Sequence, residues 1–196
     1  MIEHMVGLLS RRRFLLGAGA MAVAPGAALA KGDHPSIVYM RKVAKDMLAA
    51  HRLGTVSAFM SAIQRHAAVS DIALYSLGNY SGKLGASQRQ RYFKGVATFM
   101  SRYFADQTRT YKVAKYELGE ATVDDDKTIL IPSKVYLMTG STYTVVWRLE
   151  WKEGSYKVTD AKVLGFSLVY LQRGIFVSYL SKRQGDVAAL VTALNR

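Results

Sequence analysis

Hydrophobic positions in the first half of the chain recur at helical intervals. From Pro35, a favourable first helical residue, apolar side chains keep a period near 3.6 to about Arg52. Thr55 can cap a second helix, and Ser70 can cap a third one that ends among the glycines near Gly85. The pattern therefore predicts consecutive helices up to the middle of the chain.

The next helix has the clearest signature. Ser87 and Gln90 have the spacing of a capping box, and a wide apolar stripe follows from Tyr92 to Phe104. Its first turn carries Arg89 and Arg91, whose charge opposes the helix dipole. A basic helix start with free N–H groups suits a phosphate, although tolerance of exposed arginines is the more ordinary explanation.

From Tyr111 onward the period changes to two, which is typical of strands. Four segments alternate in this way, namely residues 111–121, 127–138, 141–151 and 155–166. The short turn signals between them predict an antiparallel meander, with Asp124-Asp125-Asp126 in a hairpin turn. The third segment places one set of residues on a common face, namely Tyr143, Val145, Trp147, Leu149 and Trp151.

Helical spacing returns near the C-terminus, over residues 167–183 and 187–194. The chain shows no internal repeat and no low-complexity tract. Helices at both ends with strands between them predict an α+β fold, in which helices pack on a curved antiparallel sheet of four or slightly more strands.

The stretch "SRRRFLLGAGAMAVAPGAALA", residues 10–30, has the zones of an export signal. A basic start precedes a short apolar run, and Ala28-Leu29-Ala30 has the small-residue pattern of a cleavage site. Paired arginines before Phe-Leu resemble a twin-arginine signal, and an ordinary Sec signal is the alternative. We therefore expect residues 1–30 to be a cleaved export signal and residues 31–196 to form a single domain.

The net charge narrows the class of molecule that the protein could bind. Residues 1–30 hold three of the 27 basic residues and one of the 14 acidic ones, so the remainder carries a net charge of +11. Such a balance indicates an anionic partner, but export makes nucleic acid a poor candidate. The basic residues are scattered, which leaves two interpretations open: a solvated surface, or attraction to anionic lipid headgroups or an acidic partner.

Catalytic and metal-binding patterns are missing from the sequence. The chain has no cysteine and no nucleotide-binding or nucleophile motif. His51 and His66 are predicted on helix surfaces without the spacing of metal ligands. Asp160 alternates with apolar neighbours and could be buried, but it has no acid or base partner in the pattern. We therefore expect no enzyme activity, no metal and no cofactor.

Aromatic residues are abundant instead. After residue 30 the chain holds 12 Tyr, two Trp and six Phe. They suit either a well-packed core or an inner face that stays partly open around an apolar ligand.

Several segments in order resemble one protein family. These segments are "YSLGNYSGKLGASQRQRYFKGVATFMSRYFADQ", "KTILIPSKVYLM", "VVWRLEWKEGSYKVTDAKVLGFSLVYLQRGIFVSYL" and "GDVAALVTAL". Their order and spacing are similar to those of the MlaC-type periplasmic phospholipid-binding proteins, over about residues 74–194.

This resemblance implies a soluble lipid carrier rather than an enzyme. Family members hold phospholipid acyl chains in a deep apolar cavity of an α+β fold, with the headgroup outside. They belong to an ABC transport system that maintains outer-membrane lipid asymmetry, also linked to toluene tolerance. The implied partners are phospholipid, an inner-membrane ABC lipid transporter complex and an outer-membrane lipoprotein complex. A sister branch is associated with hopanoids, so another apolar ligand is the alternative.

The candidate site residues follow from this resemblance and from the faces predicted above. We expect the enclosed apolar cavity to be lined by Phe99, Tyr103, Val145, Trp147, Leu149, Val163 and Phe166. We expect the headgroup or a partner to be contacted by Arg89, Arg91 and Lys94. Two other classes remain open: an exported enzyme that uses Asp160 or a histidine as base, and a structural adaptor with a closed core.

Overall fold

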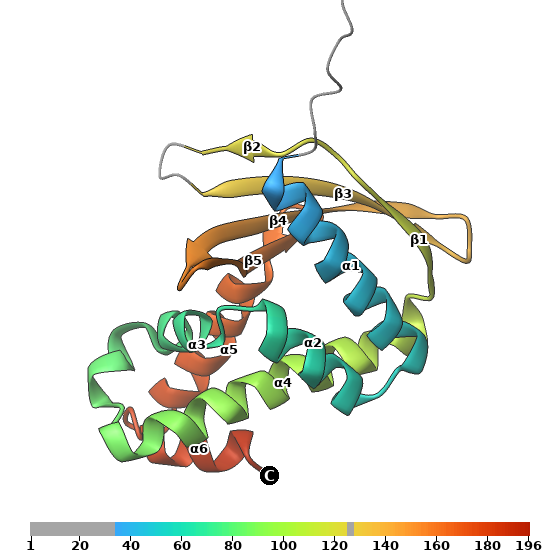
Figure 1. Ribbon diagram of the computed structural model, residues 1–196. Helices are drawn as coiled ribbons and strands as arrows, with labels where there is room; N and C mark the ends of the chain where they lie inside the picture. The colour runs from blue at the N-terminus through green and yellow to red at the C-terminus, as the bar shows by residue number, and fades with distance from the viewer. Residues whose placement is uncertain (1–33, 125–127) are drawn as a thin grey trace, which may run out of the picture. The chain divides into compact units, whose positions relative to one another are not determined.

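The computed structural model describes residues 34–124 and 128–196, which belong to one compact unit. The predicted export signal and its cleavage site lie outside the described residues. Within the described ranges, no helix is long and apolar enough to cross a membrane. Helices occupy both ends of this unit and strands its middle, so the predicted α+β class is confirmed (Figure 1).

The helices before the sheet follow the predicted order. They are α1 (Pro35–Leu53), α2 (Val56–His66), α3 (Val69–Leu77), the 3-10 turns η1 (Gly78–Lys83) and η2 (Ala86–Gln88), and α4 (Arg89–Thr110). Pro35 is the first residue of α1, as predicted. Thr55 caps α2, since its hydroxyl accepts a hydrogen bond from the Ala58 N–H at 3.3 Å.

Two predicted caps are wrong. Ser70 lies inside α3, whose N-cap is Ala68 and has no side-chain cap bond. Ser87 lies inside η2, and α4 starts after Gln88, again without a side-chain cap bond. Before α3, Ala67 forms a β-bridge with Val158 that fixes the helix start two residues early, and before α4 the 3-10 turn η2 takes up Ser87. The first free N–H groups therefore fall at a different residue from the one the spacing indicates.

The sheet is antiparallel throughout. Its strands are β1 (Val113–Leu118), β2 (Thr122–Val123), β3 (Ile129–Leu137), β4 (Thr142–Lys152), β5 (Ser155–Val163) and β6 (Phe166–Ser167). Their order is β1-β3-β4-β5-β6, and β2 pairs with β3 beside β1. The four longest strands are neighbours in chain order, which confirms the predicted meander. Two short strands extend the meander: β2 pairs with β3, and β6 pairs with β5.

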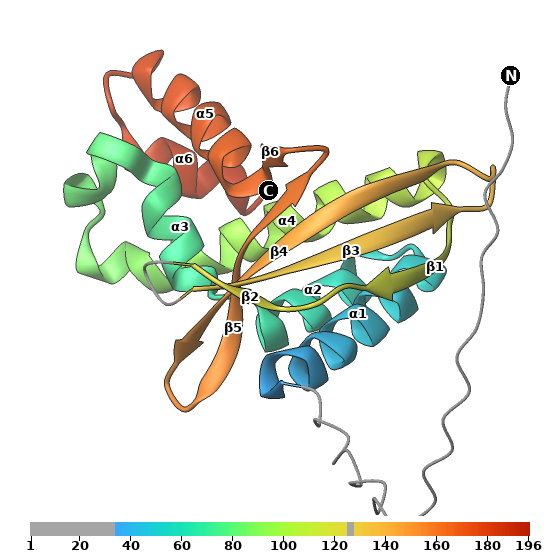
Figure 2. The same ribbon diagram turned by 90° about the horizontal axis from the view of Figure 1, so that it is seen from above.

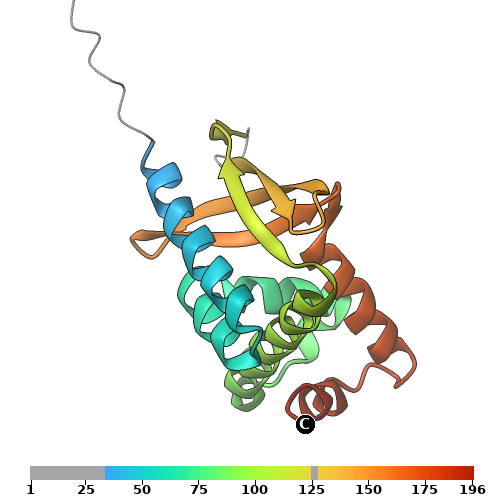
Figure 3. The same cartoon turned by 90° about the vertical axis from the view of Figure 1, so that its right-hand side faces the viewer.

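The helices lie on one side of the twisted sheet (Figures 1 and 2). Helix α1 packs beneath β1 and β3, whereas α5 (Leu168–Ser181) packs against β5. Figure 3 shows α1 and α5 on opposite sides beneath the sheet, with the junction of α4 and β1 between them. The last helix, α6 (Val187–Leu194), packs on α4 and α5.

The hydrophobic core is divided into separate clusters. At the helical end, Tyr92 and Phe176 belong to a cluster built from α3, α4, α5 and α6. Under the sheet, Met40 of α1 packs with Ile131 and Leu149 of β3 and β4. A third cluster joins α1, α2 and α4, and a small fourth one lies on the sheet. The space between these clusters is where the candidate site lies.

Candidate functional site

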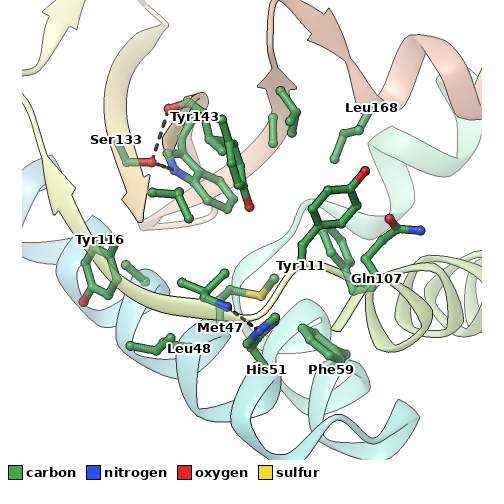
Figure 4. Close-up of a pocket in the computed structure, with 18 of the residues that line it drawn as sticks. Met47, Leu48, His51, Phe59, Gln107, Tyr111, Tyr116, Ser133, Tyr143 and Leu168 are labelled. Carbon is green, nitrogen blue, oxygen red and sulfur yellow. Dashed lines mark hydrogen bonds between the residues drawn. The ribbon is translucent and has the colours of Figure 1, made fainter. Parts of the chain in front are cut away.

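A first apolar cavity of about 340 Å³ lies between the sheet and the helices α1, α2 and α4. Its walls are almost entirely apolar or aromatic. Figure 4 shows Met47 and Phe59 on the helical side and Tyr116 and Tyr143 on the strand side, all around the same space. An interior of this composition can hold hydrocarbon but offers few partners to water.

A second cavity of about 310 Å³ lies between α2, α4, α5 and β5. Ile63 and Phe99 line it from the helices before the sheet, and Leu171 and Ile175 line it from α5. The two cavities have a common wall. The residues that line both are Met47, Tyr103, Phe104, Trp147, Ala161 and Leu168. The two cavities therefore lie side by side along this wall. We call them together the forked apolar space, and each cavity one arm of it.

Trp147 of β4 forms the central part of the shared wall, and its orientation is fixed by hydrogen bonds. The indole Nε1 donates to the Ser133 hydroxyl at 2.9 Å, and that hydroxyl donates to the Val145 carbonyl at 3.3 Å (Figure 4). The polar atom of the tryptophan is thus satisfied within the sheet, which leaves the indole ring as an apolar surface for both arms.

His51 is the polar group that connects α1 to the start of β1. Its Nε2 accepts a hydrogen bond from the Val113 N–H at 3.0 Å (Figure 4). Burial lowers the pKa of His51 below its ordinary value, because the charged imidazolium is poorly solvated there. The neutral imidazole therefore holds the edge strand in place at the wall of the first cavity.

His66 does not lie on a helix surface, as the sequence predicted, but is buried at the wall of the second cavity. Its Nε2 donates to the Asp46 carboxylate at 2.7 Å, and the Tyr39 hydroxyl lies 3.3 Å from its Nδ1. Hydrogen bonds from His66 and then Arg65 hold the pKa of Asp46 below its ordinary value. The imidazole can be buried because this carboxylate supplies a polar partner.

The mouth of the forked space is apolar. Among the described lining residues, those exposed to solvent are Tyr103, Tyr111, Leu164, Leu171 and Ile175. We call these five residues the mouth rim. They come from the C-terminal half of α4 and its C-cap Tyr111, the turn between β5 and β6, and α5. Figure 4 shows Tyr111, Gln107 and Leu168 grouped at this side of the first cavity.

Five of the seven residues predicted to line a cavity do line one. Phe99 lines the second cavity, Val145 and Val163 line the first, and Tyr103 and Trp147 line both. These placements agree with the expected site, although a lipid-binding role for these side chains stays a prediction.

The structure places the other two elsewhere. Leu149 is fully buried in the cluster beneath α1, because α1 closes over that end of β4. Phe166 is 67% exposed at the start of β6 and lines neither cavity. It follows the tight turn that ends β5, and its partner across the hairpin is Val163, so it lies at the end of the sheet next to the cavity lining rather than in it.

The basic residues predicted to contact a headgroup do not reach the mouth. Arg89, Arg91 and Lys94 are exposed in the first turns of α4. Tyr103 lies fourteen residues after Arg89, which corresponds to about 21 Å along the helix axis. Lys94 instead borders a separate polar groove with Lys152 and Lys157. A headgroup at the mouth would thus meet other side chains.

Several lining residues were not among the sequence candidates, notably Met47, Phe104, Tyr111 and Leu168. Their spacing in the sequence is the same as that of core residues. No feature of the hydrophobic pattern distinguishes a side chain that lines a cavity from one that packs in a closed core. Tyr111 carried the clearest signal, since it is an aromatic residue at the point where the period changes from helix to strand.

Asp160 has a structural role in the described fold. Its Oδ1 accepts hydrogen bonds from the N–H groups of Ala161 and Val169, at 2.8 and 3.2 Å. It thereby ties β5 to the first turn of α5. The described residues place no group of three or more potential metal ligands together.

Comparisons with known proteins agree with this architecture. The family model described as "MlaC protein" matches residues 41–196. The fold is similar to the solved structure of a phospholipid-binding protein from Ralstonia solanacearum in complex with a phospholipid, with a TM-score of 0.66 and 20% sequence identity. That match covers 81% of this chain and 93% of the other. No curated protein sequence matches the chain. Because the family model spans most of its length, the chain belongs to the MlaC family.

Proposed function

We propose that this protein binds a phospholipid, with one acyl chain in each arm of the forked cavity and the headgroup at the mouth. The observation that carries this proposal is the pair of arms: two apolar cavities of similar volume share one wall, and each contributes exposed lining residues to the mouth rim. A diacyl lipid has the same topology, with two hydrocarbon chains joined at one polar end. The related fold from Ralstonia solanacearum, described as a phospholipid complex, supports the assignment.

Burial of hydrocarbon supplies the binding free energy. Each CH₂ group removed from water contributes about 0.8 kcal/mol, so two long chains together contribute roughly 20 kcal/mol. Such a ligand does not leave into water on a useful timescale. A carrier of this kind therefore needs a membrane or a partner to receive the lipid when the cavity opens.

We further propose that the protein acts as a carrier in the periplasm. The export signal expected in residues 1–30 supports this location, and the family resemblance supports exchange with an inner-membrane ABC transporter complex and an outer-membrane lipoprotein complex. In this scheme the protein moves phospholipid between the two membranes and performs no covalent chemistry. The side chains of the site suit this role, since His51, His66 and Asp160 are each engaged in hydrogen bonds that hold the fold together.

The fork also favours a two-chain lipid over a rigid polycyclic ligand such as a hopanoid. A fused ring system cannot divide around the wall formed by Trp147 and Ala161. It would occupy one arm and leave the other without a ligand.

Native mass spectrometry and lipid analysis test the proposal. The protein is expressed as the full chain, purified without detergent and extracted with organic solvent. We expect about one diacyl phospholipid per chain. Folded protein recovered without phospholipid would overturn the proposal, and a hopanoid in the extract would replace it with the alternative ligand.

A pair of substitutions on one strand locates the ligand. Trp147→Arg places a charge in the shared wall and should remove the lipid, since a buried unpaired charge and an acyl chain cannot occupy the same apolar space. Trp151→Arg is the matched control, because Trp151 lies on the same face of β4 but is 64% exposed and outside both arms. Ala161→Leu is a milder second variant, which narrows both arms without adding charge. Unchanged lipid content in the folded Trp147 and Ala161 variants would contradict the site.

A further inference from the structure

The turn between β5 and β6 holds a leucine in an unfavourable position. Leu164 has a φ of +51° and Gly165 one of +87°, the pattern of a two-residue hairpin turn that favours Asn-Gly. A branched side chain at positive φ is strained, and this one is also 69% exposed to water. The turn does not favour a leucine here. Its side chain instead borders the first cavity, with most of its surface left exposed for a contact outside the chain.

Other exposed apolar side chains lie close to this turn. Phe166 pairs with Val163 across the hairpin, and directly opposed residues share a face of the sheet. Since Val163 lines the first cavity, Phe166 lies beside its mouth. Across the mouth, Tyr111 of the rim is exposed, and the nearby Met138 is 71% exposed, its N–H bonding the carbonyl of Lys112. Phe166 and Met138 therefore add exposed apolar side chains next to residues of the mouth rim and the first cavity.

The segments that border the mouth are basic. Residues 107–114 and 161–175 contain Arg109, Lys112, Lys162 and Arg173, and they contain no acidic residue. Arg173 donates to the Tyr75 carbonyl of α3, and Lys162 lies on the face of β5 opposite the cavity-lining Val163. Arg109 and Lys112, on either side of Tyr111, are therefore the cations of these segments that remain for a contact at the rim. Of the acids that flank them, Asp160 accepts hydrogen bonds from the backbone and Asp106 is exposed. An apolar surface with positive charges around it matches the interface of an anionic bilayer, where apolar groups enter the acyl boundary and cations meet the phosphates.

We propose that the mouth rim, together with Phe166, docks directly onto an anionic lipid bilayer. This proposal rests on the proposed lipid-binding function and adds a membrane surface as the contact of the same site. Docking places the mouth against the acyl region, so that a chain passes between bilayer and cavity without crossing water. The tyrosines of the rim suit this position, because their rings enter the interface while their hydroxyls stay among the headgroups.

Co-flotation with vesicles tests the docking. The probe is a vesicle of three parts phosphatidylethanolamine and one part phosphatidylglycerol, compared with a phosphatidylcholine vesicle. The test variant is Phe166→Ser combined with Lys112→Glu, since neither residue lines a cavity. The control is Trp151→Ser combined with Lys42→Glu, which changes an equally exposed aromatic residue and an exposed lysine away from the mouth by the same chemistry.

We expect the unchanged protein to bind the anionic vesicles more strongly than the phosphatidylcholine vesicles, and less strongly at high salt. The test variant should lose at least tenfold in partitioning, and the control should stay within twofold of the unchanged protein. Equal loss in both variants, or no vesicle binding by the unchanged protein, would overturn the docking. Vesicle binding that the test variant retains would overturn it too and assign the rim to a protein partner.

Lipid extraction from the same samples separates the two proposals. If the test variant retains its phospholipid while vesicle binding is lost, both proposals are supported. If the unchanged protein contains phospholipid but ignores vesicles, only the docking fails. If it binds vesicles as expected but contains no phospholipid, the docking is supported and only the cargo proposal fails.

Discussion

The Nε2 atom of His66 lies 2.7 Å from the Oδ2 atom of Asp46, and this contact joins the end of α2 to the middle of α1. Arg65 reaches the same carboxylate oxygen at 2.8 Å from the solvent side. The imidazole is almost completely buried and forms part of the second arm, whereas the guanidinium is more than half exposed. One carboxylate thus serves a buried and an exposed partner at nearly equal distances.

The two partners should differ in their effect on stability. Asp46→Ala leaves a buried imidazole without its partner and should lower the free energy of unfolding by about 2 kcal/mol. Arg65→Ala removes an exposed ion pair and should cost less than about 1 kcal/mol. Urea denaturation at neutral pH measures both. Equal losses in the free energy of unfolding would show that the buried hydrogen bond contributes no more than the exposed ion pair.

The Asp46 carboxylate also predicts a pH dependence at acid pH. Because its pKa is lowered from the ordinary 3.8 in the folded protein, its contribution is present above that value and is lost as the pH falls through the folded pKa. The stability difference between the unchanged protein and the Asp46→Ala variant should therefore shrink below about pH 4. A difference that stays constant down to the acid unfolding transition would contradict this assignment.

His51 predicts a separate dependence at milder pH. Its pKa is lowered from 6.5 in the folded protein, so the unfolded chain takes up a proton first as the pH falls. Stability should therefore decrease as the pH is lowered through about 6.5. A protonated Nε2 also cannot accept the Val113 N–H. His51→Gln keeps an acceptor and cannot titrate, so its stability should vary less between about pH 7.5 and pH 5.5. Urea midpoints at several pH values measure the two slopes, and identical slopes would exclude His51 as the source.

Two helical glycines should respond in opposite directions to alanine. A Cβ on Gly95 in α4 would lie 2.7 Å from the Asn195 side chain and 2.8 Å from the Leu194 Cβ. Gly95→Ala should therefore push α6 away and destabilise the protein by about 1–3 kcal/mol. Gly174 in α5 has open space around it, so Gly174→Ala should stabilise by about 0.5–1 kcal/mol. Thermal unfolding compares them, and stabilisation by Gly95→Ala would contradict the close packing of α4 on α6.

The strained turns offer a further comparison. Leu164 and Glu153 occupy equivalent positions in two hairpin turns, each at positive φ and followed by a glycine. Asparagine adopts this conformation more readily, so Leu164→Asn and Glu153→Asn should each stabilise the fold by up to about 1 kcal/mol. Vesicle binding should fall in the Leu164 variant alone. A loss of stability in either variant would show that the turn prefers its present side chain for reasons of packing.

The sequence predicted the alternation of β4 correctly but not where the cavity ends. Val145, Trp147 and Leu149 share one face, as the period of two requires. Periodicity shows which face is inward, but it does not show how far α1 extends beneath the sheet. In the structure α1 closes over Leu149 and leaves the Trp147 end open. The boundary between core and cavity is a tertiary property that depends on the crossing of two elements.

The expected headgroup residues missed the mouth for a similar reason. Arg89 and Arg91 begin a helix whose aromatic stripe leads into the cavity, so the sequence associates them with the site. The stripe is long, however, and its C-terminal end borders the opening. Residues that are close in the pattern lie at opposite ends of α4. The basic residues that do border the mouth, such as Lys112, come from segments that only the fold brings together.

The shared wall gives the cavity a property that its total volume does not. Trp147 and Ala161 line both arms, so a site that holds one acyl chain in each arm, as proposed, would distinguish ligands by the number of their chains as well as by their length. A lysophospholipid would fill one arm and leave the other as bare apolar surface. It would be held by about half of the burial free energy of its diacyl parent. The protein would then select intact lipid over its degraded product through the second acyl chain itself, with no need for a contact to the glycerol oxygen that carries it.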